Sequence, residues 1–82
     1  MLKAQQIEIT TIRVPVKRAK TLNEGRVAEV AESILEVGLT SPIQVRADGP
    51  RFVLVEGLHR LEAMKALGES TIDAYVVQAR QH

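Results

Sequence analysis

The fold is decided by residues 53–67, whose sequence is Val-Leu-Val-Glu-Gly-Leu-His-Arg-Leu-Glu-Ala-Met-Lys-Ala-Leu. The stretch begins with the apolar run at residues 52–55, which is typical of a buried strand. After Gly57, apolar residues recur at three-residue steps, as one face of a helix requires. These helical positions are Leu58, Leu61, Met64 and Leu67. We therefore predict a strand that passes into a helix through one glycine, with His59 and Arg60 in the first helical turn.

The predicted junction has the chemistry of an anion-binding site. The first N–H groups of a helix lack intrahelical partners, and the helix dipole leaves partial positive charge there. Gly57 permits positive φ and removes a Cβ that would block close approach. Arg60 adds a planar, permanently charged guanidinium suited to phosphate oxygens, and His59 can donate hydrogen bonds. The candidate phosphate-binding residues of this stretch are Gly57, Leu58, His59 and Arg60.

The same residues also allow a purely structural interpretation. Gly57 could serve only the turn, Arg60 could pair with Glu56 or Glu62, and His59 could lie on the surface. Motifs of this length often occur by chance. The strand-to-helix context leaves the two interpretations about equally supported.

Length and composition bound the class of protein. The 82 residues suffice for one small domain, and a hydrophobic content of 45% is ordinary for a globular protein. The absence of cysteine excludes a disulfide scaffold, a cysteine-ligated metal and a thiol nucleophile. No apolar run approaches a membrane span, and the N-terminus lacks the apolar segment of a signal peptide. We expect a cytoplasmic location, no membrane partner and no protein-ligated metal.

Four basic residues form a local positive cluster although the net charge is only +1. Arg13, Lys17, Arg18 and Lys20 lie close together in the sequence with no acidic residue between them. Such a cluster can bind a polyanion through its phosphate groups. A solvated loop is at least as common an explanation, so both interpretations stay open.

Periodicity and turn residues predict the order strand, helix, strand, strand, helix, strand. The first strand starts at Ile7 and bends or bulges near Thr11, where the apolar parity changes. A basic loop at residues 17–22 follows. The ends of the chain, residues 1–6 and 78–82, are expected to be loose.

The clearest amphipathic helix begins after the basic loop. Asn23 is its predicted N-cap, and Thr21 with Glu24 offers an alternative capping box. Apolar residues recur at helical spacing as far as residue 35, and Gly38 supplies the stop signal.

The second half of the chain completes the sheet. Strands 43–47 and 51–56 are predicted to form a hairpin about the turn at 48–50, and the last strand covers 71–77. The fold class is therefore α+β, with a mixed sheet of about four strands and two helices. The whole chain, 1–82, is expected to be a single domain with its core in 7–77. The side chains predicted to be buried are Val30, Ile34, Val53, Val55, Leu61 and Met64.

Two sequence motifs resemble the ParB/sulfiredoxin superfamily. The helix and following strand resemble the first half of the ParB N-terminal domain, and residues 56–63 resemble its Gly-x-(Arg/His)-Arg-x-x-Ala phosphate motif. The first motif consists of Leu22, Asn23, Arg26, Val27, Val30, Ala31, Ser33, Ile34, Gly38, Leu39, Pro42, Ile43 and Val45. The resemblance covers residues 7–77, nearly the whole chain.

This resemblance implies an α+β fold with a nucleotide pocket at the junction described above. In ParB proteins the pocket is a CTP site, and in sulfiredoxins it holds ATP beside a catalytic cysteine. Leu58 stands at that cysteine position, so sulfiredoxin chemistry is not expected. Arg26 matches a nucleotide-contacting lysine of sulfiredoxins, and Ser33 matches a contacting threonine. ParB proteins continue into DNA-binding and dimerisation domains that this sequence lacks, so it is either an excised domain or a small free-standing relative.

Three functions follow as hypotheses. The first is a ParB-like module that binds a nucleoside triphosphate, with Mg²⁺, in plasmid or chromosome partition or in DNA-linked regulation. The second is a small phosphotransferase or nucleotide hydrolase, for which Glu56 is a weak catalytic candidate beside Glu24 and Glu29. The third is a domain that contacts the DNA backbone or a protein without nucleotide. A homo-oligomer is compatible with each of them.

Overall fold

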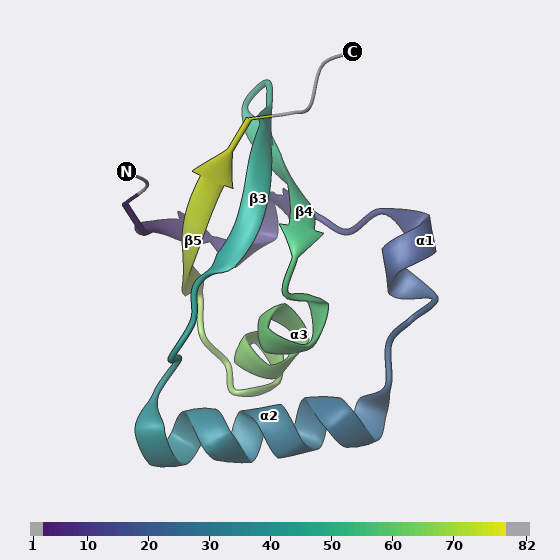
Figure 1. Ribbon diagram of the computed structural model, residues 1–82, viewed down its shortest axis with the longest axis vertical. Helices are drawn as coiled ribbons and strands as arrows, with labels where there is room; N and C mark the ends of the chain where they lie inside the picture. Colours follow the sequence, from purple (N-terminus) through teal and green to yellow (C-terminus); the bar gives the residue numbers. More distant parts are fainter. Residues whose placement is uncertain (1–2, 79–82) are drawn as a thin grey trace.

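The computed structural model describes residues 3–78, whose strands form one five-stranded mixed sheet (Figure 1). The strand order is β1-β5-β3-β4-β2. The pairs β1/β5 and β3/β4 are antiparallel, whereas β3/β5 and β2/β4 are parallel. The strands are β1 (Gln5–Glu8), β2 (Ile12–Arg13), β3 (Ile43–Asp48), β4 (Arg51–Glu56) and β5 (Thr71–Val77). The α+β class and the mixed sheet are confirmed, but the predicted number of four strands is wrong.

Within residues 3–78, three α-helices and one 3₁₀ helix accompany the sheet, where the sequence predicted two helices. They are α1 (Val16–Ala19), α2 (Glu24–Val37), α3 (Leu58–Ala66) and the 3₁₀ helix η1 (Ile9–Thr11). α1 replaces part of the predicted basic loop. It starts after Pro15, whose φ of −59° suits a helix start. One turn is too short to show a helical period, so α1 could not be predicted from the sequence.

The first predicted strand is in fact two strands at opposite edges of the sheet. η1 separates β1 from β2 at the predicted bend, and Thr11 Oγ1 donates to Glu8 O (2.6 Å) across it. Strands about 4.8 Å apart would place the edges of a flat five-stranded sheet about 19 Å apart. The four residue steps from Glu8 to Ile12 reach at most about 14 Å. The sheet must therefore curl, and in Figure 1 β1 runs across the direction of β3 and β5.

The chain ends differ in part from the expectation. Gln5 and Gln6 belong to β1 and pair with β5, so this part of the predicted loose start is ordered as a strand. Residues 1–2 and 79–82 lie outside the described residues.

One side of the sheet forms the hydrophobic core with α3 and η1. The sheet contributes alternate residues of each strand, because successive side chains point to opposite faces. The members of the main core cluster that are at most 2% exposed are Ile43, Val45, Leu54, Leu61, Ile72 and Ala74. Ile9 of η1 and Ile12 of β2 extend this cluster. The core therefore lies next to the strand–helix junction that the sequence singled out.

α2 packs against α3 and not against the sheet, as Figure 1 shows. None of its side chains is fully buried, and Leu35 and Val37 are 72% and 66% exposed. The predicted burial of Val53 and Leu61 is confirmed. Four other predicted core residues, Val30, Ile34, Val55 and Met64, are only half-buried, so this prediction was wrong for them. The two residues of α2 remain half-buried because only α3 covers their helix.

The predicted boundaries of α2 hold. Asn23 Oδ1 accepts from Arg26 N–H (3.1 Å), and Gly38 adopts φ 80° beyond the last turn. The alternative capping box is wrong, because Thr21 Oγ1 donates to Arg18 O instead (2.7 Å). The hairpin of β3 and β4 and the last strand β5 also agree with their predicted ranges. No helix within residues 3–78 is both long and apolar enough to cross a membrane.

Candidate functional site

The junction of β4 and α3 has the backbone geometry that Gly57 predicted. Gly57 is the N-cap of α3 with φ 109°, a left-handed conformation that favours glycine. A Cβ here would lie 2.6 Å from Ile43 Cγ2, so the close approach that this glycine permits is to β3. Leu61 N–H donates to Gly57 O (2.9 Å) as the first intrahelical bond of α3. The N–H groups of residues 58–60 precede it and have no partner within the helix.

His59 is tied to the start of α2. Its Nε2 accepts a hydrogen bond from the backbone N–H of Asn23 (3.1 Å), which is the N-cap of α2. An imidazole nitrogen that accepts carries no proton, so this bond assigns the proton of the neutral ring to Nδ1. His59 is thus half-buried and bonded to the start of α2.

Arg60 is tied to the segment that follows α2. Its Nη1 donates to Ser41 O and Pro42 O, both at 2.9 Å. The suggested ion pairs of Arg60 with Glu56 or Glu62 are absent from residues 3–78. Glu62 instead pairs with Lys65 (3.1 Å). Nη2 would lie 3.3 Å from a Cβ at position 57, so the guanidinium lies beside the start of α3.

A cavity of about 350 Å³ opens at this junction. Its lining comes from the β4–α3 junction, from one side of α2 and from the connector after α2. The structure therefore brings together all six predicted nucleotide-site residues, which are Arg26, Ser33, Gly57, Leu58, His59 and Arg60. The weak catalytic candidate Glu56 also lines the cavity. Glu24 and Glu29, the other carboxylates considered, do not.

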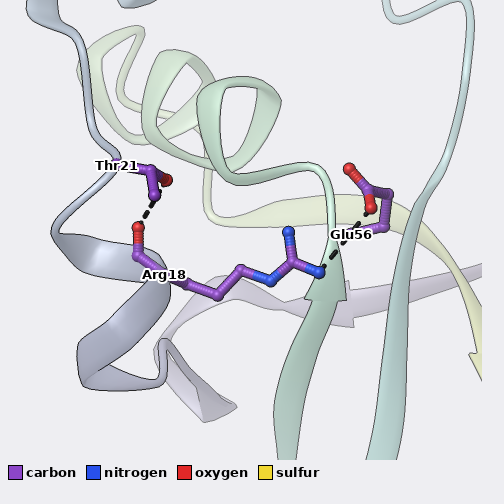
Figure 2. Close-up of polar contacts among 3 residues, drawn as sticks. All are labelled: Arg18, Thr21 and Glu56. Atoms are coloured by element: carbon purple, nitrogen blue, oxygen red, sulfur yellow. Dashed lines mark hydrogen bonds and ion pairs between the residues drawn. The ribbon is translucent and has the colours of Figure 1, made fainter.

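The basic cluster lies outside this lining. Arg13 is on β2, Lys17 and Arg18 are on α1, and Lys20 follows α1 directly. Arg18 reaches from α1 to the end of β4, where its Nη2 lies 3.7 Å from Glu56 Oε2 (Figure 2). Both side chains are largely exposed, so this ion pair is weak. It nevertheless places one cation of the cluster next to a cavity residue.

Several contacts of the site could not be read from the sequence. Asn23 was recognised as an N-cap, but its bond to a side chain 36 positions away carries no local signal. The carbonyls of Ser41 and Pro42 are backbone groups, which no side-chain pattern reveals. Leu39 and Thr40 also line the cavity. Within residues 3–78, no three His, Cys, Asp or Glu side chains gather closely enough to hold a metal ion.

Comparison with known sequences identifies the family. The family model of the ParB N-terminal domain matches residues 2–82. A probable chromosome-partitioning protein ParB from Campylobacter jejuni is 37% identical over 75 residues, which are 90% of this chain and 27% of that protein. A similar ParB from Helicobacter pylori is 37% identical over 67 residues, 82% of this chain and 23% of that protein. The chain thus spans about a quarter of the length of these ParB relatives.

Solved structures share the fold. Sulfiredoxin from Arabidopsis thaliana superposes with a TM-score of 0.83 at 28% identity, covering 94% of this chain and 86% of that one. C-terminally truncated ParB from Caulobacter crescentus, complexed with CTP-γ-S, gives 0.82 at 23% identity, covering 96% and 46%. A free serine kinase in complex with AMP gives 0.77 at 17% identity, covering 90% and 30%. Together with the family model, these similarities show that the chain belongs to the ParB N-terminal domain family, within the ParB/sulfiredoxin superfamily.

Proposed function

We propose that this chain is a nucleotide-binding module that holds the phosphates of a CTP- or ATP-type nucleotide at the start of α3. The observation that supports this most is the shared cavity. It combines a helix N-terminus without a side-chain cap, two arginines and a histidine in one space of about 350 Å³. Each of these groups favours an anion, and they come from segments far apart in the sequence.

The proposed binding chemistry assigns a part to each group. The N–H groups of residues 58–60 and the helix dipole would meet the phosphate oxygens. Arg60 would donate through Nε and Nη2, because Nη1 already serves two carbonyls. His59 would donate through Nδ1–H, since Nε2 is occupied by Asn23. Arg26 would add a second positive charge from α2, and the Ser33 hydroxyl would bond a neighbouring polar group of the nucleotide.

Nucleotides in the related structures support the same class of ligand. The Caulobacter ParB binds a CTP analogue and the free serine kinase binds AMP, although at these identities only the fold is shared. A role in plasmid or chromosome partition, or in DNA-linked regulation, is part of the proposal. It extends to this chain from ParB relatives of which the chain covers about a quarter.

Mg²⁺ fits the proposed site as a companion of the nucleotide. Among the described residues that line the cavity, Glu56 supplies the one carboxylate. Protein-bound Mg²⁺ often uses one or two carboxylates and takes its other ligands from phosphates and water. Glu56 would therefore hold the ion only together with the nucleotide. The ion would in turn neutralise part of the phosphate charge.

Calorimetric titration of CTP, ATP and ADP, with and without Mg²⁺, tests the proposal. Arg26→Ala is the informative variant, because its exposed side chain lines the cavity and has no structural bond within residues 3–78. A charged hydrogen bond is worth about 1.5–3 kcal/mol, so affinity should fall about tenfold to a hundredfold. Arg51→Ala, at the far end of β4, is the matched control and should bind like the wild type. Wild-type protein that binds none of the three nucleotides at millimolar concentration would refute the proposal.

A catalytic role is a second candidate because Glu56 lines the cavity. A carboxylate beside the terminal phosphate could activate a hydroxyl or a water molecule as general base. Its ion pair with Arg18 favours the alternative that Glu56 only anchors α1. Phosphate release and transfer to small hydroxyl acceptors should be measured for wild type and Glu56→Gln. If wild type turns over and Glu56→Gln binds nucleotide without turnover, the catalytic role is established. If both proteins turn over equally, Glu56 is excluded as the general base.

A further inference from the structure

α2 is held in place in an unusual way for a helix that lines a functional cavity. None of its side chains is fully buried, and it packs on α3 alone among the larger elements. Its N-terminus is bonded to His59, through Asn23 N–H and Nε2 (3.1 Å). The connector after it is bonded to Arg60, through Ser41 O and Pro42 O (2.9 Å each). Two adjacent side chains of α3 thus reach the start of α2 and the end of its connector, directly before β3.

We propose that His59 is a positioning residue that holds the start of α2 over the cavity, and that Arg60 fixes the connector where it enters β3, both in addition to any contact with a ligand. Hydrophobic burial alone fixes α2 weakly, because its apolar positions are half-buried. The His59 bond fixes where α2 starts, and the Arg60 bonds fix where the connector after α2 enters β3. α2 carries Arg26 and Ser33, so its position decides whether these side chains face the anion site.

Each side chain has separate groups for its two tasks. His59 uses Nε2 for Asn23 and keeps Nδ1–H as a donor. Arg60 uses Nη1 for the two carbonyls and keeps Nε and Nη2. A bound anion would therefore fix the same two side chains without displacing the bond of His59 to the start of α2 or the bonds of Arg60 to the connector. Anion binding and the order of α2 should then be coupled, and this coupling rests on the proposed nucleotide site.

The tie at His59 can be tested without any ligand. In His59→Gln the amide oxygen replaces the acceptor near the Nε2 position, whereas in His59→Asn the shorter side chain reaches only the Nδ1 position. Amide hydrogen exchange of Asn23, followed by NMR, should be about twofold to tenfold faster in His59→Asn than in wild type. His59→Gln should restore much of the protection. The Leu61 amide, bonded to Gly57 O, is the internal reference that should not change.

Equal exchange of Asn23 in the wild type and both variants would overturn the proposed tie. A wild-type imidazole ¹⁵N spectrum with the neutral proton on Nε2 would overturn it as well, because that nitrogen could not accept from Asn23. Neither result depends on nucleotide binding, so the tie and the proposed function can fail separately.

The coupling is tested by adding Mg²⁺–CTP or Mg²⁺–ATP, whichever binds in calorimetry. Exchange of the α2 amides should slow on saturation in wild type and His59→Gln, and less so in His59→Asn. A nucleotide that binds yet leaves α2 exchange unchanged in all three proteins would overturn the coupling.

Discussion

At the residue scale, Gly57 shows how far a sequence pattern reaches. Its place between a strand and a helix predicted a turn with positive φ, and the observed φ is 109°. The pattern could not predict that the missing Cβ makes room for Ile43, which lies 14 positions earlier in the chain. His59 and Arg60 were likewise recognised as polar groups of the site, but their bonds to α2 and its connector depend on tertiary contacts. Local sequence therefore singled out candidate residues and left their hydrogen-bond partners undetermined.

The account predicts that Gly57→Ala destabilises the protein for two reasons. A non-glycine residue at this φ costs about 1–3 kcal/mol, and forcing a methyl group against Ile43 costs about 1–3 kcal/mol more. Gly68→Ala is the matched control, because Gly68 also has positive φ (79°) but no atom within 4 Å of a new Cβ. Urea unfolding should show the larger loss for Gly57→Ala, and equal losses would contradict the contact with Ile43.

At the element scale, α2 was predicted accurately in its extent but not in its packing. Periodicity shows that a helix has an apolar face, but it does not say which element covers that face. In the structure α2 covers α3 and leaves Leu35 and Val37 exposed. α1 was missed because a single turn has no measurable period. The hairpin and β5 were predictable because their alternation and turn residues are local signals.

The packing of α2 predicts unequal effects of two core truncations. Leu61→Ala removes a side chain that is 0% exposed and should cost about 2–5 kcal/mol. Ile34→Ala should cost only about 1 kcal/mol, because Ile34 is half-buried. A fully buried isoleucine would lose as much stability as Leu61. Thermal and chemical unfolding of the two variants measure the difference. If Ile34→Ala proved as destabilising as Leu61→Ala, α2 would be packed more tightly than described.

The basic cluster predicts a salt-dependent interaction with polyanions if it contacts phosphates. Lys17→Gln/Lys20→Gln removes two charges while leaving the Arg18–Glu56 pair intact. The slope of log K against log salt for duplex DNA should flatten by about 0.7–0.9 per lost phosphate contact. Lys3→Gln/Lys65→Gln removes the same charge elsewhere and serves as the control. If the slope for Lys17→Gln/Lys20→Gln equals that of the wild type, these two lysines do not contact phosphates, and the basic cluster is a solvated surface.

At the scale of the whole molecule, the sheet curls, and the cavity forms where α2 and its connector meet the β4–α3 junction. β1 and β2 occupy opposite edges although only η1 separates them, a closure that no local pattern predicts. Resemblance to the superfamily predicted the class of fold and assigned Arg26 and Ser33 to the same candidate site as the junction. Those residues line one cavity in the structure. This cavity is the candidate site to test in this member of the ParB N-terminal domain family.

The most direct test of the central claim is an NMR titration of the isotope-labelled chain with Mg²⁺–CTP and Mg²⁺–ATP. The claim is that the free N–H groups at the start of α3 bind nucleotide phosphate. The account predicts that the amide signals of residues 58–60 shift together and saturate at one nucleotide per chain, while Gly49 in the distant hairpin turn stays unchanged. Signals of residues 58–60 that remain in place at millimolar nucleotide would contradict it.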